Sequence, residues 1–306
     1  MKSTFFFLDD GKNETLFNVS VSNVISKNIE QKFSISKIIG ATHGLVCLYG
    51  FHKVYKQWMV IFSNPSIRKS IGIVAPYTVS NICPTFAFGI RPDTLDPTVL
   101  KLTYAKNTMF WVVEVFSLSA SVWNNVNPNA NCPRETIKFN DSTYVVLDRF
   151  VYWVAYELIV ADDRDYNKNM LISFDLITKE FKEIHLPDSL TNEIFEPFQL
   201  TVCKLRESLV VCGCIMIDGA LQCGLWIMQD DFSFRKLYNI DANIYRILGF
   251  TKSGEAIFEP REDYGKCSTL HVYDPCSQQI KNLGIIGVEG SFIMGLYNES
   301  ILLNDQ

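Results

Sequence analysis

Residues 171–184 read LISFDLITKEFKEI, which is an apolar strand, a short polar turn and a second apolar strand. Five further segments repeat this arrangement: FFFLDDGKNETLFNV (5–19), MVIFSNPSIRKSIGI (59–73), VVEVFSLSASVWNNV (112–126), LWIMQDDFSFRKLYNI (225–240) and LHVYDPCSQQIKNLGI (270–285). Their polar turns begin at Asp9, Asn64, Ser117, Asp175, Asp230 and Asp274. The turns recur about every 50 residues, a period typical of the four-stranded blades of a β-propeller.

Six more pairs of apolar segments lie between these hairpins. They span residues 37–50, 85–105, 143–157, 198–217, 245–259 and 291–304. Most have a polar pair or a glycine at the centre, such as Asp148-Arg149, which is what a hairpin loop requires. Helical periodicity is weak, and its best segment, residues 190–198, is short and contains Pro197. We therefore predict an all-β chain.

The order of these parts predicts how the ring closes. The chain begins with an outer hairpin (5–19) and ends with an inner pair (291–304), so the two ends together supply one blade. Pairing of the N- and C-terminal strands removes the exposed edges of an open ring. We predict a single β-propeller of six four-stranded blades that occupies residues 1–306 as one domain. An irregular β-sandwich with coincidental spacing is the alternative fold.

The composition agrees with a globular all-β protein. Hydrophobic residues make up 48% and charged residues 20%, with 22 Phe, 13 Tyr and 5 Trp for half-buried sheet positions. The net charge of −5 comes from 28 basic and 33 acidic residues, without a long run of either sign. Nucleic-acid binding requires a basic surface, so we expect no nucleic-acid partner.

No segment of the sequence resembles a signal peptide or a membrane span. The apolar start ends in two aspartates, and the longest apolar run, residues 209–217, is far shorter than the ~20 residues that cross a bilayer. The nine cysteines are odd in number and irregularly spaced, which indicates free thiols in a reducing compartment. We expect a cytoplasmic or nuclear protein, or both, without a membrane partner.

Motifs that would indicate catalysis are missing from the sequence. The four histidines have no metal-ligand spacing: His43, His52, His185 and His271. Acidic residues cluster at 162–165 and 259–263, but the first cluster lacks the glycine and distal glutamate of a calcium loop. Cys212 and Cys214 lie on one face of an apolar strand and are interpreted as packing residues. We predict no enzymatic activity, no catalytic residue, no metal site and no cofactor.

A second set of short segments covers nearly the whole chain. In order they are GATHGLVCL (40–48), NPSIRK (64–69), FAFG (86–89) with VLKL (99–102), VEVFSLS (113–119) with Trp123, LISFDL (171–176) with LPD (186–188), LGF (248–250) with GE (254–255), and YDP (273–275). Together they resemble the F-box-associated domain of plant F-box and kelch-like F-box proteins, the group that includes the S-locus F-box proteins. The resemblance implies a propeller of the kelch-like type.

Three features depart from that family. Ser63 stands where the family usually has tryptophan, and His43 stands where it usually has asparagine. The helical F-box that precedes the domain in the family is not found, because the chain begins in a strand. We therefore interpret the chain as a fragment or as an F-box-less relative, and expect no binding to the Skp-type linker.

The resemblance also implies a function. In the family the associated domain is a non-enzymatic module of a Skp–cullin–F-box ubiquitin ligase, and it binds the protein substrate to be ubiquitinated. Two other functions stay open. One is a propeller enzyme or a carbohydrate-binding module, whose carboxylates, histidines or metal would converge on the central channel. The other is a scaffold, which would differ from a recognition module in its partners.

Partner binding is expected on one face of the propeller. Strands alternate in direction within a blade, so the loops between second and third strands share a face with the connections between blades. These loops mix charged residues with tyrosine, a composition that suits a protein interface. The candidate partner-binding residues are His52, Lys53, Tyr55, Asp162, Asp163, Arg164, Tyr166, Arg261, Asp263 and Tyr264. The alternative is that these residues form ordinary solvated loops.

Overall fold

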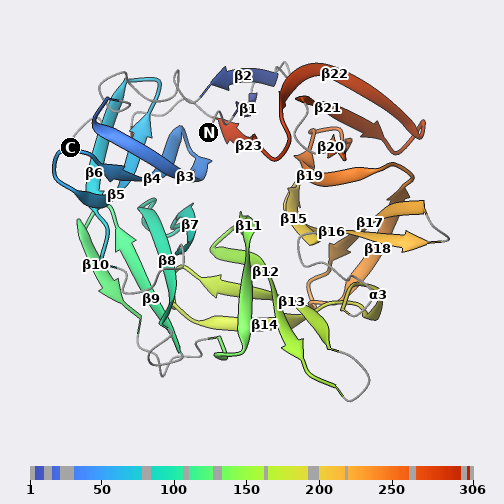
Figure 1. Cartoon of the computed structure of the whole chain (residues 1–306), viewed down its shortest axis with the longest axis horizontal. Helices are drawn as coiled ribbons and strands as arrows, with labels where there is room; N and C mark the ends of the chain where they lie inside the picture. Colours follow the sequence, from blue (N-terminus) through green and yellow to red (C-terminus); the bar gives the residue numbers. More distant parts are fainter. Residues whose placement is uncertain are drawn as a thin grey trace.

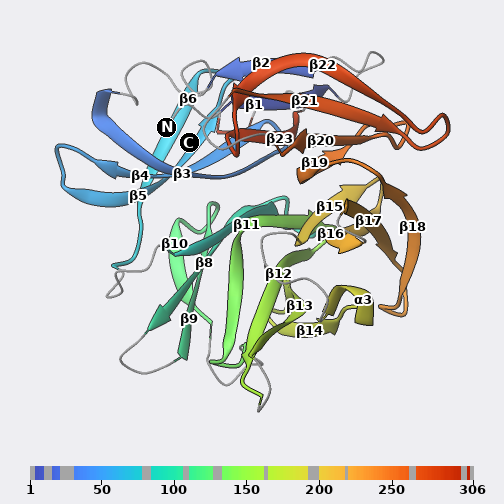
Figure 2. The same cartoon turned by 45° about the vertical axis from the view of Figure 1, so that its right-hand side comes forward.

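The computed structural model is a ring of β-sheets, seen along its shortest axis in Figure 1 and turned by 45° in Figure 2. It describes residues 4–9, 16–20, 31–77, 84–105, 110–126, 133–161, 165–191, 200–217, 220–261, 267–297 and 302–303. Five sheets have four strands each, and in every one of them the strands follow chain order. We call these sheets the first to fifth blades.

The strands of the blades alternate in direction from one to the next. The first blade contains β3 (Phe33–Thr42), β4 (Leu45–His52), β5 (Gln57–Asn64) and β6 (Lys69–Val74). The second contains β7 (Thr85–Ile90), β8 (Pro97–Ala105), β9 (Phe110–Ser117) and β10 (Val122–Asn125). The third contains β11 (Ile137–Leu147), β12 (Phe150–Ile159), β13 (Tyr166–Asp175) and β14 (Phe181–His185).

The remaining strands complete the ring. The fourth blade contains β15 (Leu200–Leu205), β16 (Ser208–Ile217), β17 (Ala220–Met228) and β18 (Phe234–Ile240). The fifth contains β19 (Ile244–Phe250), β20 (Ala256–Pro260), β21 (Cys267–Asp274) and β22 (Gln279–Val288). The last sheet is formed by both ends of the chain and contains β23 (Phe292–Tyr297), β1 (Thr4–Asp9) and β2 (Leu16–Ser20). The all-β propeller predicted from the sequence is confirmed.

The sheet formed by the chain ends differs from the prediction. β23 pairs in parallel with β1, which pairs antiparallel with β2, so this sheet has three described strands. The predicted partner of β23 within residues 291–304 is a turn at Leu302 and Leu303 instead. Leu303 is buried in the core between the first two blades, and the Asn64 side-chain amide donates to the Leu302 carbonyl at 2.8 Å. The prediction of six four-stranded blades is therefore wrong: five blades have four strands.

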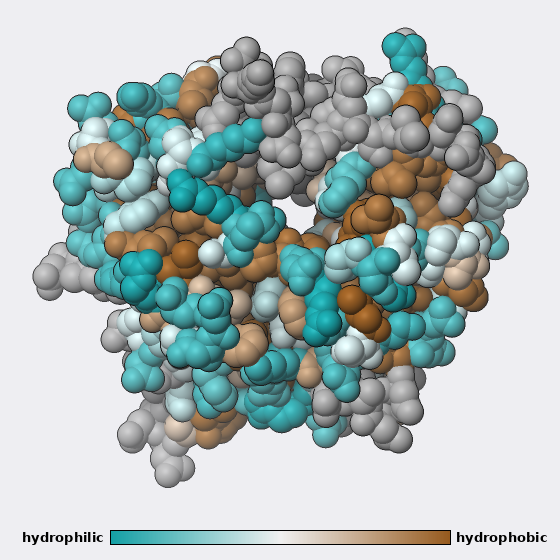
Figure 3. Space-filling model, turned by 180° about the vertical axis from the view of Figure 1, so that it is seen from behind, coloured by the Kyte–Doolittle hydropathy of each residue, from teal (hydrophilic) through white to brown (hydrophobic). Residues whose placement is uncertain are grey.

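The first strands of the sheets line the centre of the ring. β3, β7, β11, β15, β19 and β23 contact one another in this order, and β23 also contacts β3. Figure 3 shows an opening at the centre, bordered by both hydrophilic and hydrophobic side chains. The inner strands are thus held by neighbours on two sides, which is the arrangement that a ring requires.

Apolar packing between neighbouring blades forms the core. Phe62 of the first blade contacts Phe88 and Phe116 of the second, with ring centroids 5.7 and 6.0 Å apart. Similar clusters join the second to the third blade, the third to the fourth and the fourth to the fifth. All six residues of β7 are buried, whereas the outer strand β22 has no buried residue. Burial on both faces explains the nearly continuous apolar character of the inner strands.

One turn geometry explains the repeat seen in the sequence. The side chains of Asn64, Asp175 and Asp274 accept the backbone N–H two residues on, at 3.0, 2.8 and 2.8 Å. Four positions after each of these residues the backbone adopts a left-handed φ, of 53°, 62° and 56°. Asp and Asn are favoured in such turns because their short side chains bond the backbone locally. The recurring polar residue therefore marks the same hydrogen bond in three blades.

The turn of the fourth blade is built differently from the prediction. Asp230 was the expected anchor, but Asp231 accepts the backbone N–H and the hydroxyl of Ser233, at 3.0 and 2.6 Å. The N–H of Phe232 donates to the Gln229 carbonyl at 3.0 Å and closes a tighter turn. Because this turn is shorter, the carboxylate that anchors it belongs to Asp231 and not to Asp230.

One helical turn, α3 (Asp188–Thr191), interrupts the all-β pattern between the third and fourth blades. The backbone N–H groups of Leu190 and Thr191 donate to the Pro187 carbonyl, and the Asn169 amide donates to the Leu190 carbonyl at 3.2 Å. The turn therefore fastens the connection to β13. In the described part of the chain, no helix has the length and apolar character to span a membrane.

A buried ion pair fixes the connection from the fifth blade to β23. The carboxylate of Glu259, which is fully buried, lies 3.0 Å from the Arg246 guanidinium and accepts the N–H of Gly290 at 2.8 Å. Arg246 also donates to the Phe292 carbonyl at 2.7 Å. Burial raises the pKa of Glu259, while the charge of Arg246 and the Gly290 N–H oppose that effect. The pair thus joins β19 and β20 to the start of β23.

We predict that Arg246→Met destabilises the protein by about 3–5 kcal/mol, because it leaves the Glu259 carboxylate buried without a cation. In the variant, burial acts unopposed by Arg246, so the folded state binds the Glu259 proton more tightly than the unfolded chain. The variant should therefore regain stability as the pH falls through the folded pKa. Urea unfolding at several pH values measures both effects.

Arg149→Met is the matched control for this experiment. Arg149 pairs with Asp175 at 3.1 Å, but its side chain is 41% exposed. The Arg149 guanidinium is partly in water, and the buried Asp175 carboxylate keeps the N–H groups of Ile177 and Thr178 as donors, so this variant should lose less than about 1 kcal/mol. Equal losses in the two variants would contradict a special role for the Arg246–Glu259 pair.

Candidate protein-interaction site

The loops of the propeller divide between two faces. One face carries the loops between second and third strands and the connections between blades, and we call it the connection face. The opposite face carries the turns between first and second strands and between third and fourth strands, and we call it the turn face. The division follows from the alternating strand direction within each blade. The sequence-predicted partner-binding residues that the structure describes belong to the connection face or to strand ends beside it.

Five of those ten residues lie outside the described part of the chain: Asp162, Asp163, Arg164, Asp263 and Tyr264. The other five come from three different blades. Tyr166 begins β13, where it pairs with Ile159, so it lies in a strand and not in the predicted loop. Arg261 follows β20, and its N–H donates to the Asn243 carbonyl at 2.8 Å. His52, Lys53 and Tyr55 are the three that the structure brings together.

The loop after β4 is organised around His52. The N–H of Tyr55 donates to Nδ1 of His52 at 3.1 Å, and the N–H of Lys56 donates to the His52 carbonyl at 2.9 Å. The Tyr55 ring stacks on the imidazole at a centroid distance of 4.3 Å, and Phe33 contacts it edge-on at 4.5 Å. Because Nδ1 accepts a hydrogen bond, the neutral imidazole carries its proton on Nε2. His52 was predicted to contact a partner, but its side chain is 5% exposed and positions Tyr55 instead.

A groove lies along the first blade beside this loop. Its volume is about 460 Å³, within the usual range for binding cavities. Its lining includes apolar and cationic side chains, among them Phe33, Met59, Ile61, Lys32, Arg68 and Lys69. No acidic residue occurs among the described lining residues. The groove is therefore suited to an apolar or acidic group of a partner.

Exposed apolar side chains gather on the connection face of the first blade. We call this group the first-blade patch: Val54, Tyr55, Trp58, Val74 and Tyr77. Tyr77 is 89% exposed, Val54 72% and Tyr55 69%, whereas Trp58 is 43% exposed and stacks on Tyr49 at 4.8 Å. These are five of the fifteen strongly exposed large hydrophobic residues in the described chain. Such a concentration makes this patch the candidate interaction surface of the described chain.

Sequence reasoning found Tyr55 but missed the rest of the patch. Trp58 lies in β5 and Tyr77 in the connection to the second blade, so neither belongs to a loop between a second and a third strand. Phe110, Val112, Leu158 and Val160 are further exposed residues near the connection-face ends of the second and third blades. The sequence signal that could have identified this patch is the presence of aromatic residues at strand ends next to these loops.

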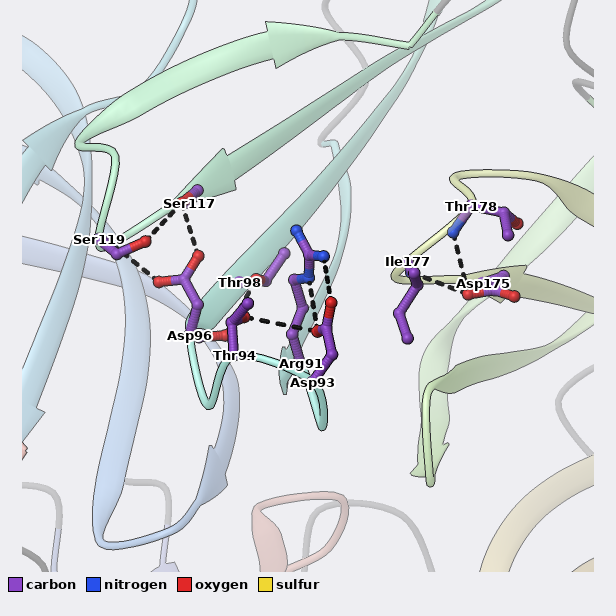
Figure 4. Close-up of polar contacts among 10 residues, drawn as sticks. All are labelled: Arg91, Asp93, Thr94, Asp96, Thr98, Ser117, Ser119, Asp175, Ile177 and Thr178. Atoms are coloured by element: carbon purple, nitrogen blue, oxygen red, sulfur yellow. Dashed lines mark hydrogen bonds and ion pairs between the residues drawn. The ribbon is translucent and has the colours of Figure 1, made fainter.

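The turn face has a different character, shown in Figure 4. Asp96 accepts the N–H of Ser119 at 2.8 Å and the hydroxyl of Ser117 at 2.5 Å, which joins the two turns of the second blade. Arg91 donates two hydrogen bonds to Asp93, at 3.1 and 2.6 Å, and these lower the pKa of the Asp93 carboxyl. These carboxylates bond their own chain, so their role is structural.

Histidine and carboxylate side chains do not gather into a recognisable catalytic centre in the described chain. No group of three or more His, Cys, Asp or Glu residues there could hold a metal ion. Arg134 binds two carboxylates of the third blade, with Glu157 at 2.9 Å and Glu183 at 3.0 Å. Hydrogen bonds from Thr136 and Arg134 lower the pKa of Glu157. This network links β12 to β14 and is accounted for by packing of the blade.

The comparison with protein families agrees with this architecture. The sequence matches the model of the F-box associated beta propeller domain over residues 2–305. The chain therefore belongs to the F-box associated β-propeller family. No curated protein matches the sequence.

Several solved structures are similar at low identity. The β-propeller domain of the Trilobed protease from Pyrococcus furiosus is 13% identical, with a TM-score of 0.49 over 83% of this chain and 71% of that one. Acylaminoacyl peptidase from Pyrococcus horikoshii is 13% identical, with a TM-score of 0.48 over 82% and 39%. Oligogalacturonate lyase from Vibrio parahaemolyticus is 9% identical, with a TM-score of 0.46 over 92% and 84%. These values do not bear on function.

We predict that Asp96→Ala destabilises the protein by about 2–3 kcal/mol, because Ser117 and Ser119 lose a buried acceptor. Asp93→Asn, which alters an exposed pair on the same loop, should change stability far less. Urea unfolding of both variants measures the difference. A loss in Asp96→Ala no larger than in Asp93→Asn would contradict the structural role of Asp96.

Proposed function

We propose that this chain is a non-enzymatic protein-recognition module that binds its partner through the connection face of the first blade. The observation that carries the proposal is the first-blade patch, because its exposed aromatic side chains have no comparable group on the described turn face. Tyr and Trp supply much of the binding energy at protein interfaces. Their low conformational freedom also reduces the entropy lost on binding.

The surroundings of the patch suit a selective interface. Lys53 and Lys56 are exposed in the same loop as Tyr55, and the groove beside them carries further cations. A charged rim around aromatic anchors favours partners of opposite charge and increases the rate of encounter. The rigid stack of Tyr55 on His52 holds one anchor in place before binding. We infer that the partner presents an apolar segment flanked by acidic residues.

Family membership supports a role in ubiquitination. We propose that the bound partner is a protein substrate of a Skp–cullin–F-box ubiquitin ligase, selected by this propeller. In this proposal the propeller is of the kelch-like type, and the sheet β2–β1–β23 is the blade that closes it. The module acts in the cytoplasm, the nucleus or both, in keeping with the free thiols of the described cysteines.

We predict that the double variant Tyr55→Ala, Tyr77→Ala binds its partner at least tenfold more weakly, because each exposed aromatic anchor contributes more than about 1 kcal/mol. Both side chains are largely exposed, so the fold should be unaffected. Proteins captured by the wild-type chain are identified by mass spectrometry, and the affinity of each is then measured with purified wild type and variant.

The matched control is the double variant Leu95→Ala, Val122→Ala on the turn face, where both side chains are also exposed. It should bind like the wild type. A version of the chain carrying an F-box tests the ligase role, since it should support ubiquitination of the captured protein in a reconstituted reaction. Binding that survives the first-blade variant but is lost in the turn-face variant would falsify the proposed surface.

A further inference from the structure

Four cysteines gather in the core between the fourth and fifth blades, away from the proposed interaction surface. They are Cys203, Cys212, Cys214 and Cys223, and each is less than 5% exposed. All four thiols are free. The sequence predicted that Cys212 and Cys214 share one face of a strand, and packing in one core cluster agrees with that prediction. The register of the neighbouring strands also places two of these cysteines directly opposite each other, which the sequence does not show.

Among these four, one pair lies directly opposite across two strands. Cys214 of β16 is the register partner of Cys223 of β17 in the antiparallel ladder. Directly opposite residues in such a ladder have Cα atoms about 4.5 or 5.5 Å apart, depending on the hydrogen-bonding site. A disulfide requires a Cα separation of about 4.4–6.8 Å. Both possible separations therefore fit a disulfide without movement of the backbone.

The other close pairs do not meet this condition. Cys212 is opposite Thr201 on one side and Leu225 on the other, while Cys203 is opposite Val210. Cys212 is therefore a diagonal neighbour of both Cys203 and Cys223. Diagonal neighbours have Cα atoms about 7–8 Å apart, beyond the range of an unstrained disulfide. The register thus singles out Cys214 and Cys223.

The electrostatic surroundings make the two thiols unequal. A hydrogen bond with the Cys223 thiol lowers the pKa of Cys214, burial opposes that effect, and the positive charge of Arg261 lowers the pKa further. The same hydrogen bond, together with burial, raises the pKa of Cys223. The thiolate is the nucleophilic form of cysteine. Cys214 is therefore the thiol that reacts first, and Cys223 is positioned to react second.

We propose that Cys214 and Cys223 form a reversible redox site that peroxide converts into an intramolecular disulfide. The Cys214 thiolate attacks hydrogen peroxide, the O–O bond breaks, and the sulfur becomes a sulfenic acid with release of hydroxide. The Cys223 sulfur then attacks that sulfur, the S–O bond breaks, and hydroxide leaves. Each of the two released hydroxides takes up one thiol proton. Two thiols and one hydrogen peroxide therefore yield one disulfide and two waters.

The position of the site connects it to the connection face. Cys214 lies three residues before the end of β16, and Cys223 lies three residues after the start of β17, so both are near the strand ends on the connection-face side. Arg261 lies on the same face after β20, so the charge that activates Cys214 comes from the next blade. A disulfide here ties two strands of the fourth blade together without touching the first-blade patch. The inference is therefore independent of the proposed function.

The full-length protein treated with hydrogen peroxide and then blocked with N-ethylmaleimide tests the proposal. Digestion at Asp218, which lies between the two cysteines in sequence, separates peptides that a Cys214–Cys223 disulfide holds together. We expect this linked pair under non-reducing conditions, its loss after dithiothreitol, and slower formation than oxidation of exposed Cys267 and Cys276. Cys223→Ala should abolish the linked pair, whereas Cys212→Ala should retain it.

Two variants test the role of charge. Arg261→Ala should slow the formation of the linked peptides several-fold, and Arg235→Ala, which removes an exposed arginine elsewhere on the fourth blade, should not. The exposed cysteines report within the same sample that the oxidant was active. Their complete oxidation without any Cys214–Cys223 peptide would overturn the proposal. A linked pair made by Cys212 in place of Cys214 would overturn it as well.

Discussion

The constraint on which this structure depends is that the inner strands of each blade are buried on both faces of the sheet. Phe62 packs against Phe88 and Phe116 across one boundary, and similar clusters occupy the next three boundaries. A sheet that needs apolar neighbours on two sides cannot end a linear stack without exposing one face to water. At the chain ends, β23 contacts β3 of the first blade and pairs with β1 in one sheet. The buried Arg246–Glu259 pair then fixes where β23 begins.

The two faces of the ring follow from the same arrangement. Turns on one face are short, and their polar side chains bond their own backbone, as Asp96 and Asp175 do. The other face carries the longer loops and the exposed aromatic residues Tyr55 and Tyr77. The described turns of one face thus stabilise the blades, while the exposed aromatic residues of the proposed interaction surface lie on the opposite face.

The fold could be predicted from the sequence where local chemistry determines structure. In three blades the hairpin recurs because Asn64, Asp175 or Asp274 bonds the backbone two residues on, and this requirement is visible in the sequence. The end of the chain could not be predicted in the same way. Leu302 and Leu303 read as a strand, but their side chains pack against the first two blades. The position of such a segment depends on distant apolar surface, which no local pattern reports.

The candidate site was predicted in outline for a similar reason. Strand alternation identified the connection face, yet the exposure of a given side chain depends on what covers it. His52 is buried because Phe33 and Tyr55 lie against its ring, whereas Tyr77 is 89% exposed. The same holds for Cys214, whose neighbour across the strands is set by register. A residue's type can be read from sequence, but its reactivity and its availability to a partner arise from contacts between blades.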